Sequence, residues 1–491
     1  MTTGKTIAKN ASWLLMATTA QKFLAFVAFT AAARIVGAEV TGQYFFAVAI
    51  TSTFVIFADL GLTPVVIRAM AADVDRGRRY LSAVVRLKTI LIPIAIVSAL
   101  VYAGIRDVSV TVWQTLFIMI VVMSLDSIHL AFYGALRGKQ RLSFEAIGMF
   151  IGQVLSTVVA ISAAFLGWGA PGLAAALCVA SAWNVGWSKW QVDRNETSQL
   201  AASREDVRMV IRQAVPFALA GIFVKIYSYL DTMVIEAFHG TAAVGTYAVA
   251  YKVTYAFQFF PLVFVAALYP AMSNVYAKGD RKTLTDVFAG ALRLMAIIVA
   301  PLAAGISAIA PRFIPMFYGS AFLGSIPALS ILAWVLIPIF FDFPVGSLLN
   351  ASHRAHIKTM TMGVAMVINA VLNILLVPVF GPVGAAISGV GSFTCLMIVG
   401  LFFARHDLPS AGWMAWLFIR TCLVGGIEWI AIRTLGAAMP FVFDVLFGAA
   451  IGVVGLLVTR LLTVEDLKSG LGWLKRKVGR SEDPEDEQLH A

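Results

Sequence analysis

Apolar stretches of about 20 residues follow one another through almost the whole chain, separated by short polar connections. A helix of this length crosses the hydrocarbon core of a bilayer, so each stretch is a candidate transmembrane helix. The composition agrees, because 60% of the 491 residues are hydrophobic, only 13% are charged and the mean hydropathy is +0.87. The sequence therefore predicts an all-α polytopic membrane protein with about fourteen transmembrane helices.

The polar connections place these helices to within a few residues, and no connection is long enough for a soluble domain. The expected spans are 11–35, 41–68, 80–103, 110–135, 143–166, 170–190, 209–238, 243–272, 284–310, 322–350, 357–379, 383–404, 413–435 and 438–461. Glycines and prolines such as those in "DLGLTP" (59–64), Pro261, Pro301 and Pro338 interrupt several of them. We expect breaks at these points, which a membrane protein tolerates where the backbone faces protein or a cavity.

The basic residues indicate the topology. The chain has 37 Lys and Arg against 26 Asp and Glu, a formal net charge of +11, and most of the basic residues lie in alternate connections and in both tails. Four such clusters are "DRGRRY" (75–80), "RGKQR" (137–141), "KGDRK" (278–282) and "KRKVGR" (475–480). By the positive-inside rule this face, here called the basic side, is cytoplasmic. We therefore expect a multi-pass membrane protein with both termini cytoplasmic, and membrane lipids rather than nucleic acid as partners.

The sequence repeats itself. "GQYFFA" (42–47) returns as "GTYAVA" (245–250), 203 residues later, and "AMAADVDRGRRYL" (69–81) resembles "AMSNVYAKGDRKTL" (271–284). We expect an N-terminal lobe at 1–200 and a C-terminal lobe at 201–407, each of six helices, related by an axis along the membrane normal. Helices 13 and 14 follow at 408–462. The segment 463–491 is expected to be a cytoplasmic amphipathic helix and an acidic disordered tail.

Lysines inside the expected spans are the candidate binding residues. A charged side chain at mid-span costs at least ~2.5–3.5 kcal/mol on insertion scales, which makes it a functional candidate. Lys22 and Lys225 are 203 residues apart, so the repeat places them at equivalent depths, and we expect both to line one aqueous cavity. Lys252 is a third basic candidate or else the partner of Asp231, and Arg34 lies near the outer end of the first helix. Snorkelling to the interface is the structural alternative for each cation.

Four carboxylates inside the spans are candidates for coupling or for structural ion pairs: Asp59, Asp126, Asp231 and Asp342. Asp126 and Asp342 are expected to correspond within about one residue in the fourth helix of each lobe. A carboxylate at membrane depth is suited to hold a coupling ion, H⁺ or Na⁺. No other cofactor and no metal site is expected.

The stretch "ARIVGAEVTGQYFFAVAITSTFVIFADLGLTPVVIRAMA" (33–71) resembles the N-terminal signature of the polysaccharide flippases that transport O-antigen or exopolysaccharide repeat units. In that signature an arginine and a glycine turn lead to a Gly-x-Tyr helix, then Asp-Leu-Gly and a cytoplasmic arginine, here Arg68. "FGPVGAAISG" (380–389) supports the resemblance. These flippases belong to the multidrug/oligosaccharidyl-lipid/polysaccharide exporter superfamily.

The resemblance implies a protein of a bacterial inner membrane, with two six-helix lobes around a cavity that opens alternately to the two sides of that membrane. The implied substrate is a polyprenyl-diphosphate-linked oligosaccharide, moved to the periplasmic leaflet for surface or exopolysaccharide biosynthesis. The cavity would be lined by the first, second, seventh and eighth helices. Polysaccharide polymerase and glycosyltransferases are the implied protein partners.

Three alternatives remain open. A peptidoglycan-precursor lipid flippase shares fourteen helices and a cationic cavity, in which arginines are expected to predominate. A drug/cation antiporter of the same superfamily is expected to have twelve helices and an acidic cavity. A membrane enzyme would need a sizeable loop with catalytic residues, whereas these connections are short and carry no catalytic constellation, so we expect no enzyme.

Overall fold

The computed structural model describes residues 3–194, 200–436 and 439–463. All regular structure within these residues is helical, as predicted. The expected amphipathic segment and acidic tail at 463–491 lie almost entirely outside the described residues.

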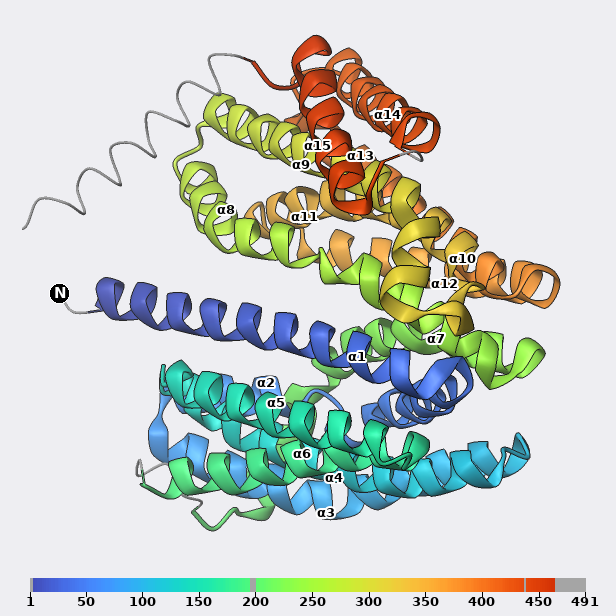
Figure 1. The fold of residues 1–491 in the computed structure, drawn as a ribbon. Coiled ribbons are helices and arrows are strands. Elements are labelled where there is room, and N and C mark those ends of the chain that lie inside the picture. Colours follow the sequence, from blue (N-terminus) through green and yellow to red (C-terminus); the bar gives the residue numbers. More distant parts are fainter. Residues whose placement is uncertain (1–2, 195–199, 437–438, 464–491) are drawn as a thin grey trace, which may run out of the picture.

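Six helices make up the first part of the chain: α1 (Thr3–Asp59), α2 (Leu62–Ala72), α3 (Val74–Ile105), α4 (Val110–Gly138), α5 (Leu142–Phe165) and α6 (Gly169–Arg194). The second part contains α7 (Arg204–Ala256), α8 (Phe259–Ala277), α9 (Arg281–Tyr318), α10 (Ser325–Leu332), α11 (Leu336–Ala351), α12 (Ala355–Phe380) and α13 (Pro382–Ala404). Two helices follow, α14 (Ala411–Thr434) and α15 (Phe441–Val458), and both pack on α9. In Figure 1, α2–α6 occupy the lower half of the molecule, α8–α15 occupy the upper half, and α1 runs between them.

Eleven helices of the described residues are long and apolar enough to cross a membrane. Two of these, Thr18–Asp59 and Gly221–Ala277, each overlap two of the predicted spans, and α6 covers the predicted span at 170–190. Each of the fourteen predicted spans therefore overlaps at least one helix of the described residues. Leu, Ile, Val and Phe side chains stand exposed along the outside of the bundle, as expected for a surface in contact with lipid tails.

The two long helices break at equivalent glycines. Gly37 in α1 has φ 79° and ψ 177°, and Gly240 in α7 has φ 75° and ψ −177°. Only glycine adopts this conformation without strain, so these two glycines determine where each long helix breaks. The two glycines are 203 residues apart, which is the offset of the Gly-x-Tyr repeat. This agreement supports the repeat, while the lobe boundaries at 200 and 407 stay predictions.

The proline breaks are confirmed in part. α1 ends at Asp59, and Leu60 (φ 40°) and Gly61 (φ 75°) turn the chain into α2, while α7 ends at Ala256, shortly before Pro261. A 3-10 turn at Ala333–Val335 precedes Pro338. The break expected at Pro301 is wrong, because α9 continues through it. Neighbouring helices bury this part of α9, where packing keeps a proline-containing helix intact.

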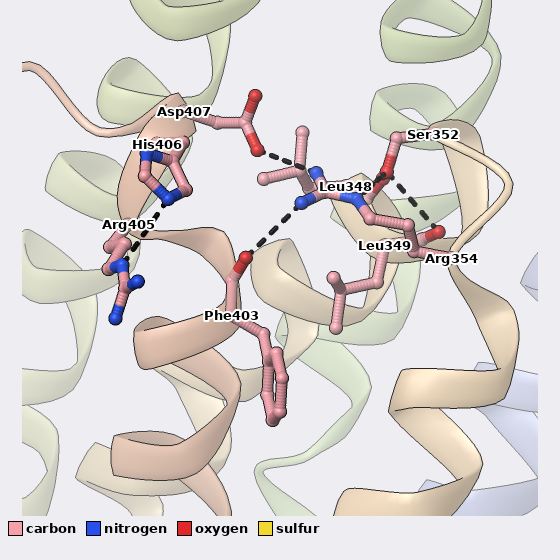
Figure 2. Close-up of polar contacts among 8 residues, drawn as sticks. All are labelled: Leu348, Leu349, Ser352, Arg354, Phe403, Arg405, His406 and Asp407. Atoms are coloured by element: carbon pink, nitrogen blue, oxygen red, sulfur yellow. Dashed lines mark hydrogen bonds and ion pairs between the residues drawn. The ribbon is translucent and has the colours of Figure 1, made fainter.

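One connection on the basic side is held by an arginine fork (Figure 2). His353, with φ 59°, ends the turn between α11 and α12. The guanidinium of Arg354 donates to Ser352 Oγ at 2.8 Å, to the carbonyl oxygen of Phe403 at 3.2 Å and to Asp407 Oδ2 at 2.6 Å. Arg354 therefore fixes this turn to the end of α13, since a planar guanidinium with three partners has little freedom to move.

The same turn geometry joins α4 to α5, where Gln140 also has φ 59°. Asp126 lies 14 residues before Gln140, whereas Asp342 lies 11 residues before His353. The expected correspondence within one residue is therefore wrong, and the two carboxylates are about one helical turn apart in depth.

Candidate functional site

The Gly-x-Tyr segments of the two repeats cross each other at the side of the molecule that lies opposite the basic side, here called the opposite side. A Cβ atom placed on Gly42 would overlap the carbonyl oxygen of Thr241, and one placed on Gly245 would overlap that of Ala38. These contacts are symmetric, because Ala38 and Thr241 occupy equivalent positions of the repeat. Only glycine lets the backbones of α1 and α7 approach this closely.

Polar contacts reinforce this crossing. The guanidinium of Arg106 at the end of α3 donates to Glu236 Oε2 on α7 at 3.0 Å, and the Thr241 hydroxyl donates to the Glu39 carboxylate. Arg34, expected to bind substrate, donates instead to the carbonyl oxygen of Met316 on α9. The two parts of the chain are therefore joined at the opposite side.

The lysines occupy the same two helices at greater depth. Lys22 and Lys225 each lie 15 residues before the glycine that breaks their helix (22 to 37, 225 to 240), about 22 Å along the axis. Lys252 lies 12 residues after Gly240, about 18 Å from the same end. Measured from the two helix breaks, Lys22 and Lys225 therefore lie at equivalent depths, as the repeat in the sequence predicted.

Aromatic rings surround two of these cations. Lys225 Nζ lies 5.8 Å from the ring centre of Tyr229, and Lys252 Nζ lies 5.3 Å from that of Phe45 and 6.0 Å from that of Phe29. Since Phe29 and Phe45 belong to α1, Lys252 sits where α7 faces α1. Neither these two lysines nor the exposed Lys22 has a hydrogen bond or an ion pair with any described residue. Three cations at membrane depth therefore keep their donors available for a ligand.

Asp59 has a structural partner. Lys88 on α3, only 2% exposed, donates to Asp59 Oδ1 at 2.9 Å, to Ser127 Oγ at 2.8 Å and to the carbonyl oxygen of Ala58 at 3.2 Å. All three donors of the ammonium are used. The pair thus closes the end of α1 at the Asp-Leu-Gly break, where helix carbonyls lack partners.

Lys88→Met should lower stability by about 3 kcal/mol, because breaking a buried pair leaves a charge uncompensated. The side chain of Asp59 is 29% exposed, so we expect a loss of stability at the lower end of the range that is usual for a broken buried ion pair. The measurement is thermal unfolding of the purified protein in detergent, with the exposed Lys278→Met as control. Asp59→Asn combined with Lys88→Met should restore much of the loss. A double variant no more stable than Lys88→Met alone would contradict this role.

Asp126 and Asp231 have different surroundings. Asp126 Oδ1 accepts from Ser181 Oγ at 2.5 Å and lies 3.1 Å from His129 Nε2, and its side chain is 41% exposed. Asp231 is buried and accepts from the Tyr247 hydroxyl at 2.6 Å and from Asn373 Nδ2 at 2.8 Å. It does not pair with Lys252.

The oxygens around Asp231 form a compact group. Asn373 Nδ2 also contacts the side-chain oxygen of Asn369 at 3.2 Å, and Asn373 Oδ1 is buried with no partner among the described residues. Carboxylate and amide oxygens are ligands that hard cations prefer. This group can therefore hold a proton or a small cation.

Asp342 forms an ion pair with Lys358 on α12, with Nζ at 2.6 and 2.5 Å from the two carboxylate oxygens. The side chains of Asp342 and Lys358 are 14% and 18% exposed. This pair links the tenth and eleventh predicted spans.

The sequence of residues 7–276, more than half of the chain, matches the family described as "Polysaccharide biosynthesis protein". The chain belongs to this family. Residues 216–375 also match the family described as "MatE".

Relatives of this chain include two proteins from Haloferax volcanii. The "Probable low-salt glycan biosynthesis flippase Agl15" is 24% identical over 391 residues, which cover 79% of this chain and 80% of the relative. The "Probable flippase AglR" is 28% identical over 38% of each chain.

Solved structures share the fold. The lipid II flippase MurJ in an inward closed conformation superposes with a TM-score of 0.74 at 15% identity, over 92% of this chain and 99% of MurJ. An inward-facing multidrug resistance MATE transporter gives a TM-score of 0.65 at 18% identity, over 78% of this chain and 94% of that transporter. At these identities the likeness establishes the fold class.

Sequence reasoning missed Lys88 and Lys358 in this family member. Both lie inside predicted spans, so the signal that selected Lys22 and Lys225 was present for them too. Asn369 and Asn373 were missed because two amides in an apolar span carry no charge. Their spacing of four residues, which puts both on one helix face, was the available signal.

Proposed function

We propose that this protein is a flippase. It moves a polyprenyl-diphosphate-linked oligosaccharide from the cytoplasmic to the periplasmic leaflet by alternating access, for surface or exopolysaccharide biosynthesis. The observation that carries the proposal is a set of three lysines, Lys22, Lys225 and Lys252, on the two helices that meet in the middle of the molecule, none of which pairs with a described residue. A diphosphate needs such countercharge to cross hydrocarbon.

The relatives and the topology support this proposal. Both Haloferax proteins carry the word flippase in their names, and Agl15 is described as acting in glycan biosynthesis. Lysine offers a flexible point charge that binds phosphate without a fixed bidentate geometry, which suits a site that must also release. The basic side is then cytoplasmic, and the contacts between α1 and α7 close the periplasmic side in this structure.

The test is mass spectrometry of polyprenyl-diphosphate lipids from cells that lack the protein, compared with wild-type cells. We expect one complete glycan to accumulate on its lipid while less polymer appears outside. Accumulation of the peptidoglycan precursor instead would assign the protein to that pathway. An unchanged lipid pool together with altered export of cationic dyes would favour a drug antiporter.

We further propose that Asp231 holds the coupling ion, H⁺ or Na⁺. Its carboxylate, buried beside Asn369 and Asn373, provides the oxygens that such an ion needs. Inward movement of one positive charge releases about 2.3 kcal/mol per 100 mV, enough to contribute to outward transport of the substrate.

Asp231→Asn should remove the stimulation of export by the coupling ion, because the amide keeps the volume but loses the negative charge. Export in cells is measured against external pH and against external sodium. Wild type should respond to one of the two, and the variant to neither. The exposed Asp75→Asn serves as control. If Asp231→Asn kept the wild-type response, the ion would have to bind elsewhere.

A further inference from the structure

Two adjoining cavities lie within the second part of the chain, and none of the three central lysines is among their lining residues. The larger, about 420 Å³, is bounded by α8, α11 and α12 and has Tyr269, Ser347 and Asn350 in its wall. The smaller, about 210 Å³, is bounded by α7, α11, α12 and α13, and its wall is mainly apolar, with Phe223 and Phe393 among its residues. The ion pair of Asp342 and Lys358 belongs to both walls.

The ammonium of Lys358 is paired with Asp342, but not all of its hydrogen-bond donors are used. Its ammonium has three donors, two of which reach the carboxylate of Asp342, and no third partner exists among the described residues. The lysine stem passes over Gly346 of α11, where a Cβ atom would lie at an ordinary contact distance of 3.4 Å from Lys358 Cε. The side chain therefore lies in a groove of α11 with one donor available to the cavity.

The walls around this cation are fixed. Asn350 and Ala355 flank the turn between α11 and α12, which Arg354 holds against Asp407 and the end of α13 (Figure 2). At the corresponding turn of the first part, five residues past the left-handed position, Glu145 replaces Lys358 and pairs with Arg137. The cationic cavity is therefore a feature of the second part of the repeat.

We propose that Lys358 binds the phosphoryl group of a lipid phosphate in the larger cavity, while the apolar cavity beside it receives the adjoining hydrocarbon. A lipid phosphate brings more acceptor oxygens than one carboxylate, and a diphosphate also brings more negative charge, so it can draw the ammonium away from Asp342. Asp342 thus acts as an internal competitor that holds the lysine when no ligand is bound. The inference rests on the proposed function where the lipid phosphate is the transported substrate.

The test is a calorimetric titration of the purified full-length protein with farnesyl diphosphate. Lys358→Gln should weaken binding at least about tenfold, the effect of losing ~1.4 kcal/mol of a charge-assisted contact. Asp342→Asn should tighten binding severalfold, because it frees the ammonium and removes a like charge. Lys358→Arg should keep most of the affinity, and the exposed Lys278→Gln should leave it unchanged.

The opposite changes in affinity expected for Lys358→Gln and Asp342→Asn distinguish a ligand site from a structural ion pair. If Asp342→Asn weakened binding as much as Lys358→Gln, or if farnesol bound as well as farnesyl diphosphate, the proposal would be overturned. Absence of binding by wild type would overturn it too. Asp342→Asn decides the question even if Lys358→Gln does not fold.

Competition then identifies the source of the phosphoryl group. Displacement of farnesyl diphosphate by phosphatidylglycerol would support the site and assign it to membrane phospholipid. Resistance to phosphatidylglycerol would support the site and assign it to the diphosphate lipid. Neither result depends on the lipid pools of deletion cells, so a failure of this inference and a failure of the flippase proposal are distinguishable.

Discussion

Replacing Lys22 and Lys225 together by glutamine should lower export of the glycan by about two to four orders of magnitude. Each lysine is expected to make a hydrogen bond between charged groups with the diphosphate, and such bonds contribute ~1.5–3 kcal/mol each. Neither lysine has a partner among the described residues, so the substitution breaks no internal ion pair and should leave folding intact. The measurement is polysaccharide output in a deletion strain complemented with the variant.

The matched control is the double variant Lys278→Gln and Lys282→Gln, which removes the same charge from an exposed connection of the basic side. Its export should equal that of wild type. Membrane content of both variants is compared by immunoblotting, so that lost insertion is separated from lost transport. Normal output from the Lys22 and Lys225 double variant would show that the substrate does not use these cations.

Gly42→Ala should hold the molecule open at the opposite side and stop export. The added Cβ would overlap the carbonyl oxygen of Thr241, and because that atom belongs to the backbone, α1 and α7 must separate. Gly245→Ala should act in the same way, through Ala38. The separation is measured as the distance between spin labels at Ile35 and Phe238, equivalent exposed positions on the two helices near this end. It should increase in both variants.

Gly104→Ala is the control for this experiment, because a Cβ at that position meets no atom within 4 Å. It should change neither the label distance nor the export. If Gly42→Ala gave the wild-type distance together with normal export, closure at this crossing would not be part of the transport cycle.

The fold and its repeat were predictable because both depend on local properties of the chain. Hydropathy over about 20 residues placed the fourteen spans, and the Gly-x-Tyr offset of 203 residues matches the distance between the breaks at Gly37 and Gly240. The continuation of α9 through Pro301 was not predictable, since it depends on the helices that cover it.

For the candidate site, the sequence allowed the depth of the cations to be derived, whereas their role in binding stays a prediction. Depth along a helix follows from residue count, so the equivalence of Lys22 and Lys225 could be derived. Partners depend instead on how each helix is rotated about its axis, which hydropathy alone does not determine. For this reason Asp59 and Asp342 could be selected from the sequence, whereas their partners Lys88 and Lys358 required the structure.

The most direct test of the proposed flippase activity is reconstitution with the lipid that accumulates in cells lacking the protein. That lipid-linked glycan is incorporated into liposomes with and without the purified protein, and its exposure to an external lectin is followed over time. We expect the protein to expose glycan that is initially protected in the inner leaflet, and the Lys22 and Lys225 double variant not to do so. A protected fraction that stays constant with the wild-type protein, under each coupling-ion gradient, would contradict the proposed flippase.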